Sequence, residues 1–440
     1  MSFKSLGLAE EIVGALEEQG YSKPTVIQQL AIPKILSGVD VIAGAQTGTG
    51  KTASFTLPLL QRLFQDQHVE SLPKVKALIL APTRELACQV HSSVEAYAKN
   101  LPFKSVVLYG GVEYAGQISK LEAGAHVVVA TPGRLMDLLD KGYVSFHHIQ
   151  YLVVDEADRM LDMGFVPMVR RIMARLPRQR QTLFFSATFS PEVKALAKVL
   201  LKSPVSIQAE KLNSTAAKLT HVVHPVDIEK KRPLLSYLIG SNNWQQVLIF
   251  TRTKASADCL SKELTLDGIR NMVIHGDRTQ AYRAKSLSHF KEGKIQALVA
   301  TDIAARGLDI ENLPYVINYE LPNIPEDYVH RVGRTGRAGQ EGLAVTLVTD
   351  REVLRLMEIE KLIKMQIEKK RVPGFEPRNF DPDRALREQR ERRRSKVRKH
   401  AQSKGQGKSR GKGPSKPFKT AKPTGKTKPA GKKKVNKKRR

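Results

Sequence analysis

Three carboxylates lie within four positions of the sequence, directly after an apolar run. Asp155, Glu156 and Asp158 follow the residues Tyr-Leu-Val-Val at 151–154, a pattern typical of a buried strand. Like charges crowded together in a folded protein cost free energy unless a positive group is held among them. The chain must therefore supply or recruit a positive partner at this point.

A glycine-rich segment earlier in the chain offers that partner. Gly48, Gly50, Lys51 and Thr52 stand in the sequence AGAQTGTGKTAS. Backbone N–H groups of such a loop wrap phosphate oxygens, the lysine neutralises the β and γ phosphates, and the threonine hydroxyl can bind Mg²⁺. We therefore expect a P-loop, although Ala45 stands where the general pattern begins with glycine.

The P-loop gives the acidic cluster a chemical role. Asp155 is expected to hold Mg²⁺ together with Thr52, and Glu156 to orient and deprotonate the water that attacks the γ-phosphate. The alternative, an acidic strand end without function, is disfavoured beside a P-loop.

The second half of the chain contains no further Gly-Lys-Ser/Thr sequence, so we expect one nucleotide site. It contains HRVGRTGRAG, with Arg331, Arg334 and Arg337 at three-residue spacing. Guanidinium groups stabilise the charge on transferred phosphoryl oxygens, and an arginine from another domain can serve this purpose. A solvated basic loop or an ordinary RNA contact is the alternative.

Short β-rich runs alternate with amphipathic helical patterns, beginning with a strand expected at residues 39–43. This alternation predicts α/β domains with parallel sheets, whose ligands bind at the carboxyl ends of the strands. The polar stretch at residues 210–220 separates two such series, and every polar motif named here is expected to follow a strand. The other runs are VKALILAPT, HVVVATPG, YLVVDEAD and QTLFFSAT before that stretch, and QVLIFTRT, IQALVATD, YVINYELP and LAVTLVTD after it.

Composition places the chain among globular proteins with a basic tail. Its 440 residues are 41% hydrophobic and carry a net charge of +30; residues 391–440 hold 22 Lys+Arg and one Glu, a net of +21. Such a tail cannot bury enough apolar surface to fold, so we expect disorder and nucleic-acid binding, with a solubilising or targeting tail as the alternative. Two cysteines, Cys88 and Cys259, match no metal spacing, and no run reaches membrane-span length.

Together the motifs resemble those of DEAD-box RNA helicases, in that family's order. They are GYSKPTVIQ, AQTGTGKT with its alanine, PTRELA, a Gly-Gly pair, TPGR, DEAD, SAT, LIFTRT, TDIAARGLD and HRVGRTGR. Val26 stands where the family more usually has proline. The N-terminal sequence, MSFKSLGLAEEIVGALEEQGYSKPT, is similar to that of the bacterial RhlE-like branch.

The resemblance, which runs from about Phe3 to about residue 370, implies two tandem RecA-like parallel-sheet domains followed by a disordered basic tail. We expect an ATP-binding domain at 1–209, a hinge at 210–219, a second helicase domain at 220–371 and the tail at 372–440. ATP and Mg²⁺ are the implied cofactors, and RNA, gripped mainly by its sugar-phosphate backbone, is the implied partner.

The resemblance also assigns roles to individual residues. A glutamine amide can pair with adenine N6 and N7, which favours ATP over GTP. The catalytic residues implied are Lys51, Asp155, Glu156, Arg334 and Arg337. Nucleotide contacts are assigned to Phe3, Gln28, Gln46, Thr47, Gly48, Thr49, Gly50, Lys51, Thr52 and Asp309, and metal ligation to Thr52 and Asp155. Coupling is assigned to Asp158, Ser186, Thr188 and His330. RNA contacts are assigned to Pro82, Thr83, Arg84, Gly110, Gly111, Thr131, Pro132, Gly133, Arg134, Arg252, Gln280, Arg283, Thr301 and Asp302.

The function expected is ATP-dependent separation of short RNA duplexes or remodelling of RNA–protein complexes. An ATP-gated RNA clamp or annealing protein is the alternative, and a DNA translocase fits the domains but not the motif wording. Ribosome assembly or RNA turnover in a bacterial cytoplasm follows by analogy, with ribosomal precursors or the RNA-degradation machinery as candidate partners.

Overall fold

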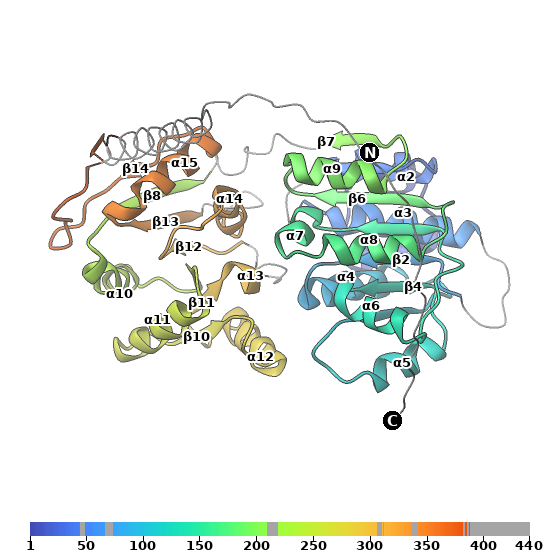
Figure 1. Ribbon diagram of the computed structural model, residues 1–440, viewed down its shortest axis with the longest axis horizontal. Coiled ribbons are helices and arrows are strands. Elements are labelled where there is room, and N and C mark those ends of the chain that lie inside the picture. Colours follow the sequence, from blue (N-terminus) through green and yellow to red (C-terminus); the bar gives the residue numbers. More distant parts are fainter. Residues whose placement is uncertain are drawn as a thin grey trace, which may run out of the picture. The chain divides into compact units, whose positions relative to one another are not determined.

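The computed structural model describes residues 1–44, 49–66, 74–208, 219–305, 310, 312–336, 342–381, 383–384 and 387. These residues form two seven-stranded parallel sheets, each covered by helices on both faces (Figure 1). The helices and strands that the structure describes lie within one compact unit, Met1–Ala385.

The first sheet has the strand order β3-β4-β2-β5-β6-β1-β7. Successive residues of its strands enter opposite cores: in β5, Tyr151 and Val153 pack on one face, and Leu152 and Val154 on the other. Both faces of these strands are therefore buried, as a parallel sheet requires. The strands are β1 (Val41–Gly44), β2 (Ala77–Leu80), β3 (Ser105–Leu108), β4 (Val127–Ala130), β5 (Tyr151–Val154), β6 (Gln181–Ser186) and β7 (Val205–Gln208).

Helices α1 to α4 cover one face of this sheet and α5 to α9 the other, as Figure 1 shows for α6, α8 and α9 in front of the strands. A short 3-10 helix, η1 (Lys4–Leu6), precedes them. Their bounds are α1 (Glu10–Glu18), α2 (Val26–Leu36), α3 (Lys51–Gln65), α4 (Arg84–Tyr97), α5 (Ala115–Glu122), α6 (Pro132–Asp140), α7 (Ala157–Asp162), α8 (Val166–Ala174) and α9 (Pro191–Leu200).

The second sheet has the order β10-β11-β9-β12-β13-β8-β14. Its strands are β8 (Thr220–Pro225), β9 (Val247–Thr251), β10 (Asn271–Ile274), β11 (Ala297–Thr301), β12 (Tyr315–Asn318), β13 (Leu343–Val348) and β14 (Glu368–Lys369). Its helices are η3 (Ile228–Lys230), α10 (Lys231–Ser241), α11 (Lys254–Leu266), α12 (Gln280–Lys291), α13 (Asp302–Ala305), α14 (Pro325–Val332), η4 (Asp350–Glu352) and α15 (Val353–Ile363). Helices α10 and α11 pack on one face, and α12 to α15 on the other.

The expected fold class, two α/β domains with parallel sheets, is confirmed, and each predicted apolar run contains a strand. Two details were wrong. The first strand begins at Val41 rather than residue 39, because the Asp40 carboxylate accepts hydrogen bonds from the N–H groups of Thr182 and Lys202, each at 2.7 Å, and so lies ahead of the ladder. The arginine-rich motif does not follow a strand, since its first residues lie in α14.

The second domain continues to pack beyond residue 371, where its end was expected. The Phe375 ring lies 5.5 Å from the Tyr237 ring, and Lys230 Nζ donates to the Gly374 carbonyl over 3.1 Å. The Arg378 N–H donates to the Asp227 carboxylate. These contacts hold the chain after β14 against the second sheet's domain. Most of the expected hinge, residues 210–218, and residues 388–440 of the tail lie outside the described residues.

None of the helices that the structure describes is long and apolar enough to cross a membrane.

Candidate nucleotide and RNA site

The side chain of Gln28 is already oriented at the start of α2. It is 2% exposed, its Oε1 accepts from the Thr25 N–H at 2.9 Å, and its Nε2 donates to the Gly50 carbonyl at 3.2 Å. An amide oxygen accepts two hydrogen bonds and an amide nitrogen donates two, so each end keeps one for a ligand. The amide can therefore read both N6 and N7 of adenine without giving up its present partners.

Phe3 does not lie in an open position. Its ring is 3% exposed and belongs to the core cluster that contains Leu6, Leu8 and Ile27 of α2. The ring is thus part of the first domain's core, and the nucleotide contact assigned to Phe3 stays a prediction.

The P-loop is described only at its end, because Gln46, Thr47 and Gly48 lie outside the described residues. Gly50 has φ +87°, a left-handed conformation that favours glycine, and it begins α3. Lys51 is 5% exposed, and its Nζ has no hydrogen-bond partner among the described residues. A buried ammonium without a partner is costly unless an anion binds, so the position fits a phosphate. Thr49 precedes this turn, and Thr52 is the second residue of α3.

The acidic cluster stands at the carboxyl end of β5, as expected. Burial raises the pKa of Asp155 from 3.8 to about 6; the positive charge of Lys51 opposes this rise, and the negative charge of Glu156 adds to it. Glu156 has φ +46°, and its N–H donates to Asp155 Oδ1 over 2.9 Å. A left-handed glutamate stores backbone strain, which is typical of functional positions.

These residues fit a magnesium ion that is bound together with phosphates. Nowhere in the described ranges do three or more His, Cys, Asp or Glu side chains form a metal-binding group. Mg²⁺ commonly takes one or two protein oxygens and completes its shell with phosphate oxygens and water. Asp155 and Thr52 match that donor set.

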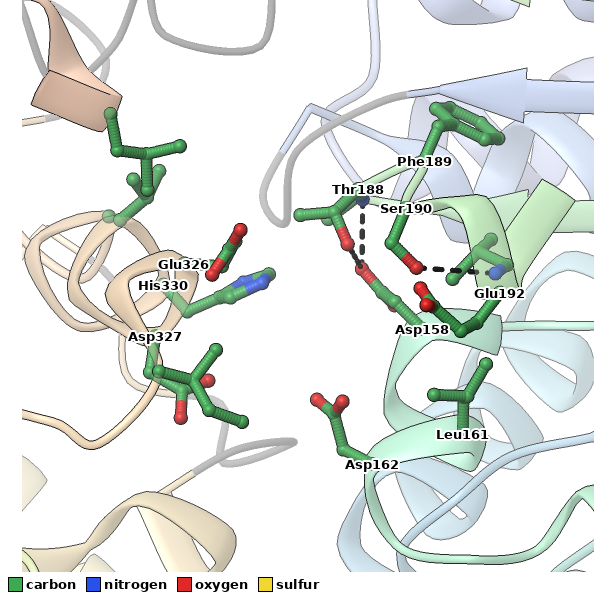
Figure 2. A pocket seen from close by; sticks show the side chains of 16 residues that line it. Asp158, Leu161, Asp162, Thr188, Phe189, Ser190, Glu192, Glu326, Asp327 and His330 are labelled. Atoms are coloured by element: carbon green, nitrogen blue, oxygen red, sulfur yellow. Dashed lines mark hydrogen bonds between the residues drawn. The ribbon is translucent and has the colours of Figure 1, made fainter. Parts of the chain in front are cut away.

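The third carboxylate connects the cluster to the Ser-Ala-Thr motif after β6. Asp158 Oδ2 accepts from the Thr188 N–H at 2.8 Å and from Thr188 Oγ1 at 2.9 Å (Figure 2). Ser186 Oγ donates to the Thr188 carbonyl at 2.7 Å and accepts from the Asp158 N–H at 3.3 Å. Three of the predicted coupling residues thus form one hydrogen-bonded unit.

His330, the fourth predicted coupling residue, lines the same pocket of about 430 Å³ as Asp158 and Thr188. Burial, together with the positive charge of Arg159, lowers the pKa of His330 from 6.5 to about 3. The imidazole is therefore neutral at physiological pH and can act as a hydrogen-bond donor and acceptor rather than as a cation.

The arginines of the second domain differ in their surroundings. Arg331 is fully buried: its guanidinium donates to both oxygens of Asp302 at 2.6 and 2.7 Å, to Asn318 Oδ1 at 2.9 Å and to the Glu320 carbonyl at 2.6 Å. It cannot serve as a mobile phosphate ligand without breaking these bonds. Arg334 follows α14 and is buried; Arg337 and Asp309 lie outside the described residues.

In the first domain, the predicted RNA contacts gather where helices begin after strands. Arg84 starts α4 after β2, and Thr83 Oγ1 caps that helix by accepting from the Leu86 N–H at 3.3 Å. A helix N-terminus offers unpaired N–H groups to phosphate oxygens. The others there are Pro82 before α4, the pair Gly110 and Gly111 after β3, and Thr131, Pro132, Gly133 and Arg134 at the start of α6.

In the second domain, several predicted RNA contacts already have partners. The Arg252 N–H donates to Glu320 Oε2 at 2.7 Å, Arg283 Nη1 lies 2.9 Å from Glu85 Oε1, and the Asp302 carboxylate binds Arg331. RNA must compete with these pairs or use backbone groups at the same positions. Gln280 begins α12, and Thr301 ends β11.

Sequence reasoning missed Tyr114 and Gln117, which fasten the loop that carries the Gly-Gly pair. Gln117 Nε2 donates to the Tyr109 carbonyl at 3.0 Å, and its Oε1 accepts from the Tyr109 N–H at 3.2 Å. A glutamine six residues after a Gly-Gly pair was the available signal. For Tyr114, the only signal was an aromatic residue within an otherwise polar loop.

The fold and the site define a class first: a P-loop nucleotide-hydrolysing protein built from two RecA-like domains. Residues 25–196 match the family model described as DEAD/DEAH box helicase, and residues 229–339 match the helicase conserved C-terminal domain.

Known relatives refine that class. The chain is 40% identical over 375 residues to the DEAD-box ATP-dependent RNA helicase CshA of Geobacillus kaustophilus, covering 85% of this chain and 79% of the relative. It is 41% identical to the CshA of Limosilactobacillus reuteri, covering 83% and 73%. The structure of S. cerevisiae Dbp5 bound to RNA and ADP BeF3 superposes with a TM-score of 0.76 at 31% identity, covering 84% of this chain and 95% of that one.

The chain therefore belongs to the DEAD-box ATP-dependent RNA helicase family. It is an ATP hydrolase and RNA helicase that uses ATP with Mg²⁺. The predicted family is confirmed.

Proposed function

We propose that the chain couples ATP hydrolysis to local separation of short RNA duplexes or to remodelling of RNA–protein complexes, gripping RNA by its sugar-phosphate backbone. The observation that carries this proposal is the hydrogen-bonded unit of Asp158, Ser186 and Thr188. Asp158 follows Asp155 and Glu156, the two carboxylates near Lys51, in the chain. A shift of these carboxylates on nucleotide binding would therefore be passed through Asp158 to Ser186 and Thr188 at the carboxyl edge of the sheet. The helix N-termini suited to RNA phosphates lie at that same edge.

We assign the nucleotide roles as follows. Lys51 binds phosphate oxygens, Glu156 orients the attacking water and accepts its proton, and Gln28 reads adenine. Asp155 and Thr52 hold Mg²⁺, which when bound neutralises charge on the phosphates. Further contacts are assigned to Thr49 and Gly50, to the P-loop residues Gln46, Thr47 and Gly48, to Asp309 at the ribose, and to Arg334 and Arg337 at the γ-phosphate.

The domain limits, the branch and the cellular role are assigned from the motifs and the resemblance. We propose a first domain at 1–209, a connecting hinge at 210–219, and a second domain that begins at 220 and extends past the expected limit of 371 to about residue 378. The basic tail that follows is proposed to add RNA affinity. Membership of the RhlE-like branch is supported by the N-terminal wording, whereas the relatives reported above carry the name CshA. A bacterial cytoplasmic role in ribosome assembly or RNA turnover is proposed on the same resemblance.

The decisive experiment compares the wild type with Glu156→Gln. ATP hydrolysis should be stimulated by RNA but not by DNA, and a short RNA duplex should be displaced in an ATP-dependent way. Glu156→Gln should bind ATP and RNA yet hydrolyse ATP about 10²–10⁴-fold more slowly, the range typical of a lost general base. Glu122→Gln, an exposed acid on α5, is the matched control.

A clamp or annealing protein would behave differently. It would hydrolyse ATP with RNA but displace no duplex, and it would hold RNA longest in the ATP-bound state. Equal stimulation by DNA, or normal turnover by Glu156→Gln, would contradict the proposed helicase mechanism.

A further inference from the structure

One face of α6 holds the ring of Tyr114. Arg134 Cζ and Lys141 Nζ each lie 4.0 Å from the ring centroid, and the Tyr114 hydroxyl donates to Asp137 Oδ2 at 3.3 Å. Positions 134, 137 and 141 are spaced by three and four residues, so they line up along one side of a helix. The ring therefore contacts this helix at three points, two of which are cation–π contacts.

Arg134 extends the connection to the backbone of the Gly-Gly loop. Its side chain is only 5% exposed, and Nη2 donates to the Val112 carbonyl over 2.7 Å. Its Nε and Nη1 are buried and have no hydrogen-bond partner within the part of the chain that the structure describes. The charge of the buried guanidinium is instead stabilised by the Tyr114 ring, over which its Cζ lies at 4.0 Å from the centroid. Arg134 thus links α6 to the loop rather than projecting into solvent.

The other side of the loop is also fixed. Gln117 binds both backbone groups of Tyr109. Gly111 has φ +76°, and a Cβ at this position would lie 2.3 Å from both terminal nitrogens of Arg84. Only glycine therefore lets the Arg84 guanidinium lie against the loop. The segment from residue 109 to residue 114 is held at both ends and against α4.

We propose that Tyr114 is a positioning residue for RNA: it sets the spacing between the Gly110–Gly111 loop and the N-terminus of α6. Lys141 acts through the Tyr114 ring, Arg134 acts through that ring and through the Val112 carbonyl, and neither acts by touching RNA. This inference rests on the proposed RNA-binding role of the two segments, and it changes the expected role of Arg134 from a contact to a support. Two phosphate sites at a fixed distance bind a backbone better than the same sites on a mobile loop, because less conformational freedom is lost on binding.

The test uses the full-length chain with Tyr114→Ala, Tyr114→Phe and Lys141→Ala. RNA affinity is measured over a salt series with a non-hydrolysable ATP analogue, and ATP turnover is measured against RNA concentration. Tyr114→Ala should weaken RNA affinity and raise the KM for RNA about tenfold, because two cation–π contacts are lost together. The kcat at saturating RNA should change less than twofold. Tyr114→Phe keeps the ring and should stay within twofold of wild type in both measurements.

The salt dependence separates positioning from contact. A side chain that neutralises a phosphate contributes about 0.7 to the slope of log affinity against log salt on a single strand. Lys141→Ala should leave that slope unchanged and weaken affinity no further when combined with Tyr114→Ala, since both act through one ring. Lys120→Ala, which removes an exposed lysine of α5, is the matched charge control and should behave as wild type.

Each other outcome has a distinct meaning. If Lys141→Ala lowers the slope by one phosphate contact while Tyr114→Ala binds normally, the lysine touches RNA and the proposal is rejected. Arg84→Ala tests the underlying site: it should weaken binding and lower the slope. If Arg84→Ala has no effect, the proposed RNA site itself is wrong. If Arg84→Ala acts as expected and Tyr114→Ala does nothing, only the positioning role fails.

Discussion

Gly50 of the phosphate loop accepts a hydrogen bond from Gln28, the glutamine that we assign to adenine, so a single methyl group there should disturb both. Gly50 has φ +87°, and a Cβ would lie 2.4 Å from Gln28 Nε2. An L-residue pays roughly 1–2 kcal/mol for the left-handed conformation. Moving the amide away also breaks its 3.2 Å hydrogen bond to the Gly50 carbonyl, which costs about 0.5–1.5 kcal/mol. Gly50→Ala should therefore lower the free energy of unfolding by about 1.5–3.5 kcal/mol.

Gly38→Ala is the matched control, because Gly38 has φ +83° and its nearest neighbour to a new Cβ is Arg62 Nη1 at 4.0 Å. The Gly38→Ala variant has the same backbone strain as Gly50→Ala, but its new Cβ collides with no neighbouring atom. The two variants should differ by about 1 kcal/mol, or about 2–4 °C in the melting temperature of a domain of this size. Removing the collision with Gln28→Ala in the Gly50→Ala background should recover part of that difference.

The functional assay is the ratio of kcat/KM for ATP to that for GTP, measured by RNA-stimulated phosphate release. Gly50→Ala should reduce this ratio about tenfold, because a displaced amide loses its paired contacts to adenine. Gly38→Ala should leave the ratio unchanged. Equal melting temperatures for the two alanine variants, together with a preserved ATP preference, would refute the reasoning.

Three further predictions concern buried charges. The pKa of Asp155 is raised from 3.8 to about 6, so the protonated carboxyl favours the folded state below pH 3.8, and this contribution is lost as the pH rises through 6. Asp155→Asn should therefore stabilise the ligand-free protein at pH 7.5 by up to about 3 kcal/mol, but not at pH 4. Thermal melts at the two pH values measure this difference. Arg331→Ala should cost about 3–5 kcal/mol, seen as loss of the second domain's unfolding transition at its normal temperature, because Asp302 is left without its cation. Arg351→Ala, which removes an exposed side chain of η4, should cost almost nothing. Lys231 Nζ donates to Glu352 Oε2 at 2.6 Å within the core, so Lys231→Met should destabilise by a similar amount, and adding Glu352→Gln should restore part of the loss; a fully additive double variant would contradict this.

The sequence allowed the fold class and the nucleotide site to be predicted because both are written in consecutive residues. An apolar β-branched run followed by a polar motif marks a parallel strand and its carboxyl end together. Asp155, Glu156 and Asp158 were found this way, as was Lys51. Successive side chains of a strand point to opposite faces of the sheet, so the sequence alone also shows which side chains share a core.

Other features depended on burial and on partners distant in sequence. Equal spacing does not separate Arg331 from Arg334 and Arg337, yet Arg331 is held by Asp302, Asn318 and Glu320, which come from separate segments. Phe3 was assigned to the nucleotide from its residue type and position, and the structure shows that its ring lies in the core of the first domain. In both cases tertiary packing, which the local pattern does not contain, decided the environment.

The buried guanidinium of Arg331 also has a mechanical consequence. This side chain of α14 forms a bidentate ion pair with Asp302 at the start of α13. It also donates to Asn318 at the end of β12 and to the nearby Glu320 carbonyl, so it connects three segments of the domain. A paired fork resists shear in its plane better than a single bond, because both contacts must break together. A force on the segment after β11 is therefore transmitted directly to α14 through Arg331. Under force, α13, β12 and α14 should therefore stay together and then unfold in one cooperative step.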